Sequence, residues 1–282
     1  MEIESPRFLI VSMPKSGTHL LSGIISTVLE SKSLPYYFSF SRENDNFCIQ
    51  MEENEFGGNR AKWVNFKKNY PFAFYTEHYF SDPELLLFLV RPGELAISHL
   101  PRKDVPAILD PCFFYIFMVR DIESIIASTF NTERKIVLQN PSIRVEFYED
   151  INFTDPTKDD ISNFVFRAFD NLVPLFLDML YWQYCSNSFC ISYNDVFCKN
   201  ERFNFLIKKI CNFKNKNFSP EIFTEFRDFN QTNLSDDDKT ISSEDVKMLL
   251  DAYPLFGRIN QEINSILSKN FIGSTLSKLP II

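Results

Sequence analysis

The chain has 282 residues, of which 45% are hydrophobic and 23% are charged. These fractions are typical of a globular protein, and the length fits one large α/β domain or two small ones. The 7 glycines and 6 cysteines are too few for a collagenous chain or a disulfide-held miniprotein. The 29 basic and 37 acidic residues give a net charge of −8. This charge disfavours nucleic acids and anionic membranes as partners, because their phosphates would be repelled.

The six cysteines show neither a CxxC pair nor the spacing of a zinc site. We expect them to be buried free thiols in a reducing compartment, where such residues behave as small hydrophobic side chains. The first residues are too few and too acidic for a signal peptide. No apolar run approaches the roughly 18–20 residues that a membrane helix needs. The sequence therefore predicts a cytoplasmic protein without a membrane partner.

Strands alternating with helices are predicted along the chain. Short apolar runs, rich in β-branched and aromatic residues, predict buried strands at residues 8–13, 95–100, 113–119 and 189–193. Apolar residues at helical spacing predict helices over residues 20–29, from residue 122 onward with Asp121 as the cap, and over residues 164–184. This alternation predicts an α/β fold, a single domain over residues 1–282 whose central parallel sheet carries helices on both faces.

Three polar segments with turn signals interrupt this pattern: residues 36–70, 131–162 and 228–243. Loops of this length in a compact domain are usually functional or disordered, so we expect them to be excursions from the sheet. After the third excursion, Ser242 and Ser243 are expected to open the last helix.

The sequence PKSGT at residues 14–18 lies between a predicted strand and a predicted helix. A turn at this place directs backbone N–H groups at an anion, while Lys15 supplies a charge and Gly17 allows close approach. Ser16 and Thr18 add hydroxyl groups. It is not a Walker A loop, because the lysine precedes the glycine. The alternative is an ordinary turn with a solvated lysine.

The sequence VRDIESIIAS at residues 119–128 leaves another predicted strand with Arg120 at its carboxyl end. Ligands of open α/β sheets bind at that edge, and an arginine fork with the hydroxyl of Ser128 suits a terminal phosphate. The alternative is a capped helix with a surface pair between Arg120 and Asp121.

Together these two motifs resemble the nucleotide-binding signatures of the cytosolic-type PAPS-dependent sulfotransferases, where PAPS is 3′-phosphoadenosine 5′-phosphosulfate. SHLP at residues 98–101 resembles the segment that carries the catalytic histidine of that family. SYNDV at residues 192–196 is similar to its YED segment at a strand end. The order and spacing agree over about residues 8–200.

The resemblance implies a binding site for PAPS. Its 5′-phosphosulfate would be surrounded by Lys15, Ser16, Gly17, Thr18 and His19. Arg120 and Ser128 would hold the 3′-phosphate, and Tyr193 would face the adenosine. Arg227, in FRDFN, is the nearest match to the arginine of the family's C-terminal RKGxxGDW element, the rest of which is missing here.

The implied reaction moves a sulfuryl group from PAPS to a hydroxyl, amine or amide nitrogen of a small-molecule acceptor, leaving adenosine 3′,5′-bisphosphate. His99 would be the general base, while Lys15 and the loop amides would stabilise the charge that grows on the bridging oxygen. The resemblance implies no metal. Ile97 stands where cytosolic members tend to have a lysine.

Two other functions stay open from the sequence. One is a nucleotide-binding regulatory protein without catalysis, which the missing C-terminal element and Ile97 allow. The other is a small-molecule kinase, which would need Mg²⁺ and a Walker-type pair of lysine and serine or threonine that the chain lacks.

Acidic residues gather in two of the excursions. Residues 141–160 contain six carboxylates against two basic side chains, and residues 42–55 contain five against one. Beside Phe147, Tyr148 and Phe153, such a negative mouth would attract a cationic or neutral small molecule. The alternative is a solvated loop surface.

Overall fold

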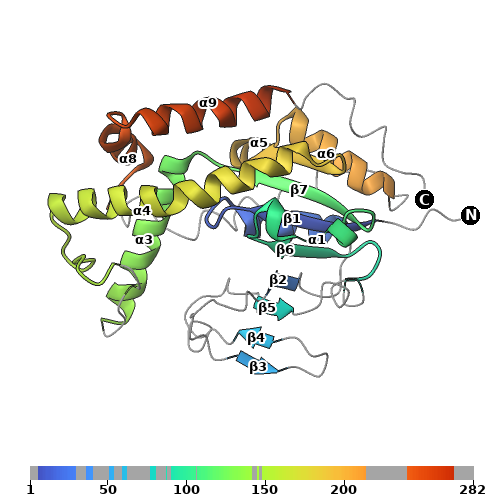
Figure 1. Ribbon diagram of the computed structural model, residues 1–282, viewed down its shortest axis with the longest axis horizontal. Helices are drawn as coiled ribbons and strands as arrows, with labels where there is room; N and C mark the ends of the chain where they lie inside the picture. Colours follow the sequence, from blue (N-terminus) through green and yellow to red (C-terminus); the bar gives the residue numbers. More distant parts are fainter. Residues whose placement is uncertain are drawn as a thin grey trace, which may run out of the picture.

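The computed structural model describes residues 6–29, 36–40, 51–53, 59–61, 77–80, 87, 90–105, 107–141, 145, 148–213 and 240–269. The strands of this part form one sheet (Figure 1): β1 (Arg7–Ser12), β2 (Tyr36–Phe40), β3 (Met51–Glu53), β4 (Asn59–Ala61), β5 (Glu77–Phe80), β6 (Leu95–Ser98), β7 (Phe113–Val119) and β8 (Ser188–Ser192). The helices are α1 (Thr18–Leu29), α3 (Ile122–Gln139), α4 (Lys158–Met179), α5 (Tyr193–Cys198), α6 (Glu201–Phe213), α8 (Ser243–Leu250) and α9 (Pro254–Lys269). Short 3-10 helices are η2 (Arg102–Asp104), η3 (Ala107–Leu109) and η4 (Leu180–Tyr184).

The order of the strands across the sheet is β3-β4-β5-β2-β6-β1-β7-β8. All pairs from β5 to β8 are parallel, and β3, β4 and β5 pair antiparallel at one edge. From β1 the chain first builds the side that contains β6 and β2, and later crosses to β7 and β8 on the other side. This reversal makes the carboxyl end of β1 a topological switch point, where open α/β sheets bind their ligands.

The helices cover both faces of the sheet, as predicted. Along β1, Leu9 and Val11 point into a core shared with α3, α4, α8 and α9, whereas Phe8 and Ile10 point into a core shared with α1 and α6. Side chains of β7 alternate in the same way, which is the two-residue period of a strand. The α/β prediction with a central parallel sheet is therefore confirmed.

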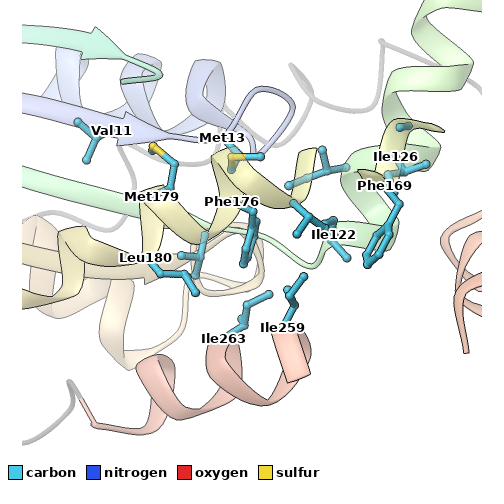
Figure 2. Packing of buried hydrophobic residues seen from close by; sticks show 14 of the residues in the cluster. Val11, Met13, Ile122, Ile126, Phe169, Phe176, Met179, Leu180, Ile259 and Ile263 are labelled. Carbon is cyan, nitrogen blue, oxygen red and sulfur yellow. The ribbon is translucent and has the colours of Figure 1, made fainter. Parts of the chain in front are cut away.

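The larger core holds α4 between the sheet and α9. Figure 2 shows Phe176 and Met179 of α4 between Val11, on the strand side, and Ile263 of α9. Phe176, Met179 and Val11 are at most 2% exposed, and complete burial of one such side chain contributes roughly 1.5–3 kcal/mol. Because α4 packs on the sheet and on α3, it supports the strand ends from one side.

The predicted excursion at residues 131–162 is wrong at both ends. The structure continues α3 to Gln139 and begins α4 at Lys158, where Thr157 and Asp160 form a capping box. The helical pattern was hidden because the buried position at residue 131 is a polar asparagine. Asn131 donates from Nδ2 to the carbonyl oxygen of Ile241, 2.8 Å away, so its burial needs no apolar side chain.

The excursion predicted at residues 36–70 is also partly wrong. It contributes β2, β3 and β4 to the sheet, and β5 follows at residues 77–80. β2 has the sequence YYFSF, whose aromatic residues fit a strand once it pairs with β6. In the third excursion, residues 228–239 lie outside the described part of the chain.

Smaller differences concern element ends. The strand predicted over residues 95–100 stops at Ser98, and the strand predicted over 189–193 runs from Ser188 to Ser192. The helix predicted over 164–184 begins earlier and turns into η4 at Leu180. Ser242 caps α8 as predicted, but α9 follows it. Among the helices that the structure describes, none is long and apolar enough to cross a membrane.

Candidate active site

The turn between β1 and α1 has an unusual backbone. Lys15 has a φ of 63° and Gly17 a φ of 90°, both in the left-handed region that ordinary residues avoid. The turn is closed by the amide of Ser16, which donates to the carbonyl oxygen of Met13 at 3.2 Å. Left-handed residues within such a turn direct N–H groups to one side and create a concave surface for an anion.

Gly17 is required at its position for a second reason. A Cβ atom on Gly17 would lie 2.4 Å from Cδ2 of Tyr193 and 3.1 Å from Cε of Met118. Tyr193 is the first residue of α5, directly after β8, and its ring stacks on that of Phe197. The backbone of the loop is therefore pressed against an aromatic ring, which an ordinary solvated turn does not require.

Arg120, directly after β7, joins this cluster. Its Nη1 donates to the carbonyl oxygen of Lys15 at 2.9 Å, and its guanidinium carbon lies 4.2 Å from the centre of the Tyr193 ring. Asp121 accepts from the amide of Ser124 and caps α3. The structure thus directs Arg120 to the loop, whereas Asp121 caps α3 as predicted.

His99 follows β6 and contacts the end of β1. Its Nδ1 lies 2.6 Å from the carbonyl oxygen of Ser12 and 3.4 Å from Oγ of the same residue. Because a carbonyl oxygen can only accept, this contact favours the tautomer with its hydrogen on Nδ1 and the lone pair of the neutral ring on Nε2. Oγ of Ser12 lies 2.5 Å from Oγ1 of Thr18 in the loop. A chain of polar contacts therefore connects His99 with the loop.

The electrostatic environment of the loop includes a carboxylate from α3. Protein atoms crowded around the Lys15 ammonium lower its pKa, although the residue as a whole is exposed, and the nearby Glu133 carboxylate acts in the opposite direction. Burial raises the pKa of Glu133, and Lys15 lowers it in turn. The Lys15 ammonium and the Glu133 carboxylate thus interact electrostatically beside the β1–α1 loop.

Sequence reasoning missed two residues of this site. Ser12 occupies a strand position with 0% exposure. A polar side chain in a fully buried strand must be hydrogen-bonded, so a serine inside the predicted strand at residues 8–13 was a usable signal of a polar contact. Glu133 gave no signal, because only the path of α3 brings it near Lys15.

Other predicted site residues are not brought together by any described contact. Ser128 is half-buried on α3, two turns beyond Arg120, and its carbonyl oxygen accepts from Thr132 Oγ1 at 2.7 Å. His19 lies in the first turn of α1, and its side chain is outside the described part. Arg227 is also outside the described residues.

Two of the three aromatic residues predicted beside the acceptor, Tyr148 and Phe153, pack in or against the core instead. Phe153 is 3% exposed, with its ring 5.3 Å from that of Phe130. Tyr148 packs on Phe164 at 4.5 Å and under the guanidinium of Arg167. For Tyr148 and Phe153 the prediction is wrong, because both rings pack on aromatic side chains of α3 or α4. Phe147 lies outside the described residues.

Several of the predicted acidic residues have structural partners. Asp150 is paired with Arg167 at 2.5 Å, and Asp160 accepts from Thr157 in the capping box of α4. Within the described part of the chain, no group of three or more histidine, cysteine, aspartate or glutamate side chains could hold a metal ion.

An α/β sheet with a turn suited to an anion at its switch point, an arginine that contacts this turn and a histidine that contacts the strand before it is an arrangement suited to a nucleotide-dependent transferase. The family model described as "Sulfotransferase domain" matches residues 5–248. The chain therefore belongs to the sulfotransferase family, and it is an enzyme that transfers a sulfuryl group from PAPS. This supports the first of the three functions considered from the sequence.

Three solved structures are similar to this chain, at 15–16% sequence identity. A retinol dehydratase in complex with retinol and PAP is 16% identical with a TM-score of 0.45, covering 96% of this chain and 84% of that one. The mouse sulfotransferase SULT7A1 complexed with PAP is 15% identical with a TM-score of 0.42, covering 96% and 86%. Retinol dehydratase with androsterone and the inactive cofactor PAP is 16% identical with a TM-score of 0.44, covering 95% and 82%. No curated protein sequence matches the chain.

Proposed function

We propose that the β1–α1 loop and Arg120 hold the two phosphate-bearing ends of PAPS while its sulfuryl group passes to a small-molecule acceptor. One observation carries this proposal. Oγ of Ser16 and Nε of Arg120 are buried, and neither has a hydrogen-bond partner among the described residues. A buried donor left unsatisfied costs roughly 1–3 kcal/mol. Phosphate and sulfate oxygens accept hydrogen bonds and would satisfy both groups.

PAPS would be bound by residues that follow several strands of the sheet. Its 5′-phosphosulfate would lie against Lys15, Ser16, Gly17, Thr18 and His19, at the N-terminus of α1. The 3′-phosphate would bind Arg120 and Ser128, and the adenosine would lie by Tyr193, with Arg227 contributing from the C-terminal side. Arg120 suits its role because, among the described residues, Nη1 donates to Lys15 while the buried Nε has no partner and stays available to a phosphate.

The chemistry is an in-line displacement at sulfur. The acceptor oxygen or nitrogen forms a bond to sulfur while the bond from sulfur to the bridging oxygen breaks, and that oxygen keeps the electron pair on adenosine 3′,5′-bisphosphate. His99 would take the acceptor's proton on Nε2, because Nδ1 already donates to Ser12. Lys15 and the loop amides would stabilise the charge on the leaving oxygen.

The acceptor is proposed to be a cationic or neutral small molecule. The net charge of −8 and the exposed carboxylates of Asp155 and Asp159 support this charge preference. A cytoplasmic location and a single domain over residues 1–282 complete the proposal. The free thiols of Cys112, Cys185, Cys190, Cys198 and Cys211 support a reducing compartment.

The test is a screen of small-molecule acceptors with PAPS, in which mass spectrometry detects the gain of one sulfuryl group with and without EDTA. We expect transfer that EDTA does not abolish. Calorimetry with adenosine 3′,5′-bisphosphate and adenosine 5′-monophosphate then tests the nucleotide site, where the bisphosphate should bind more tightly. Equal binding of the two nucleotides, or transfer from ATP instead of PAPS, would contradict the proposal.

A further inference from the structure

Ser12 contacts both the donor-binding loop and the histidine. It is the last residue of β1 and is 0% exposed, and Thr18, at the start of α1, is 5% exposed. Oγ of Ser12 lies 2.5 Å from Oγ1 of Thr18 and 3.4 Å from Nδ1 of His99. A hydroxyl has one hydrogen to donate, so Ser12 can donate toward Thr18 or toward His99, but not toward both.

We propose that Ser12 is a positioning residue that couples binding of the sulfuryl donor to the orientation and tautomer of His99. The inference rests on the proposed function, in which Thr18 binds the phosphosulfate and His99 is the base. Oxygens of a phosphosulfate accept hydrogen bonds, so Thr18 donates its hydroxyl hydrogen to the donor molecule. Its oxygen then accepts from Ser12, and the Ser12 hydrogen is directed away from the imidazole.

This ordering favours the reactive form of His99. When the Ser12 hydroxyl donates its hydrogen to Thr18, its oxygen can accept from Nδ1–H of His99. The carbonyl oxygen of Ser12, 2.6 Å from Nδ1, accepts from the same group. Both oxygens then select the tautomer whose lone pair lies on Nε2. Without the donor, the same hydroxyl can point its hydrogen toward Nδ1, which opposes the tautomer that the carbonyl oxygen favours and lowers its population. The contact of 3.4 Å is long, and catalytic hydrogen bonds often shorten when substrates bind.

Nitrogen NMR of ¹⁵N-histidine-labelled protein tests the coupling directly. The chain has only three histidines, and a His99→Gln variant assigns the ring signals of His99. We expect adenosine 3′,5′-bisphosphate to raise the fraction of His99 protonated on Nδ1 in the wild-type protein. In Ser12→Ala this response should disappear, although the bisphosphate still binds. An unchanged response in Ser12→Ala would overturn the proposal.

Kinetics provide a second readout. At saturating PAPS, Ser12→Ala and Thr18→Val should each lower kcat by up to about 10²-fold, since misplacing a catalytic group by about 1 Å can cost this much. The double variant should be no slower than the slower single variant, because one chain of contacts is broken only once. Ser162→Ala, which removes an exposed hydroxyl that donates to Lys158, is the matched control and should keep full activity.

Independent, multiplicative losses in the double variant would overturn the proposal. Its failure is distinguishable from failure of the proposed function. A wild-type protein that transfers no sulfuryl group contradicts the function, whereas active wild-type protein with multiplicative losses contradicts only the coupling through Ser12.

Discussion

Replacing Gly17 by alanine tests the strained turn at the centre of the site. An L residue at a φ of 90° is strained by roughly 1–2 kcal/mol. The added Cβ would lie 2.4 Å from Cδ2 of Tyr193, and overpacking of this kind adds about 1–3 kcal/mol. The ring cannot move aside easily, because Arg120 covers it at 4.2 Å and Phe197 stacks on it. We therefore expect Gly17→Ala to lower the free energy of unfolding by about 2–5 kcal/mol.

Thermal unfolding followed by circular dichroism measures this loss, which corresponds to a fall in Tm of roughly 5–15 °C. Gly257→Ala on α9 is the matched control, because a Cβ there meets no atom within 4 Å and the residue is helical. It should be neutral or stabilising by up to about 1 kcal/mol. Placing Gly17→Ala in a Tyr193→Ala background removes the collision with the Tyr193 ring but not the backbone strain, so only about 1–2 kcal/mol should remain. A Gly17→Ala protein as stable as the wild type would refute the described geometry of the turn.

Further predictions concern the other members of the site. His99→Ala should lower kcat by about 10²–10⁴ with nearly unchanged affinity for the donor; near-normal turnover in steady-state assays would assign the base elsewhere. Arg120→Ala should weaken binding of adenosine 3′,5′-bisphosphate by about 2–4 kcal/mol in calorimetry. Binding of adenosine 5′-phosphosulfate, which lacks the 3′-phosphate, should be little affected. Equal weakening for both nucleotides would instead indicate that Arg120 acts through its contact with Lys15. Because Glu133 opposes the lowering of the Lys15 pKa by burial, Glu133→Gln should lower that pKa further. The alkaline limb of the pH profile of kcat should then move to lower pH. An unchanged limb would contradict the proximity of the Glu133 carboxylate to the Lys15 ammonium.

The elements nearest the site were predictable because their sequences carry strong local signals. The run FFYIFMV is β7 without any shift, and Asp121 caps α3 as expected. A strand buried on both faces needs continuous apolar residues, and a short acidic side chain satisfies the first amides of a helix. These signals are local in the chain and do not depend on distant contacts.

The elements that were missed depend on distant partners. β2 becomes a strand by pairing with β5 and β6, with Tyr37 opposite Ile97. The later turns of α3 are anchored where Asn131 bonds the backbone of Ile241, at a sequence separation of 110 residues. A pattern read along the chain contains no information about such partners, because propensity is overridden by tertiary contacts.

The convergence of the site residues follows from the register of the parallel strands. Val11 lies opposite Ser98, Ser12 opposite Met118, and Val119 opposite Ser192. Motifs placed just beyond these strand ends therefore emerge at one edge of the sheet, which is why their order along the sequence was informative. A slip of one residue would exchange every side chain between the two faces. The division of β1 between the two cores, with Val11 in one and Ile10 in the other, opposes such a slip. Packing of the two cores thus determines how closely His99, the loop and Arg120 approach one another.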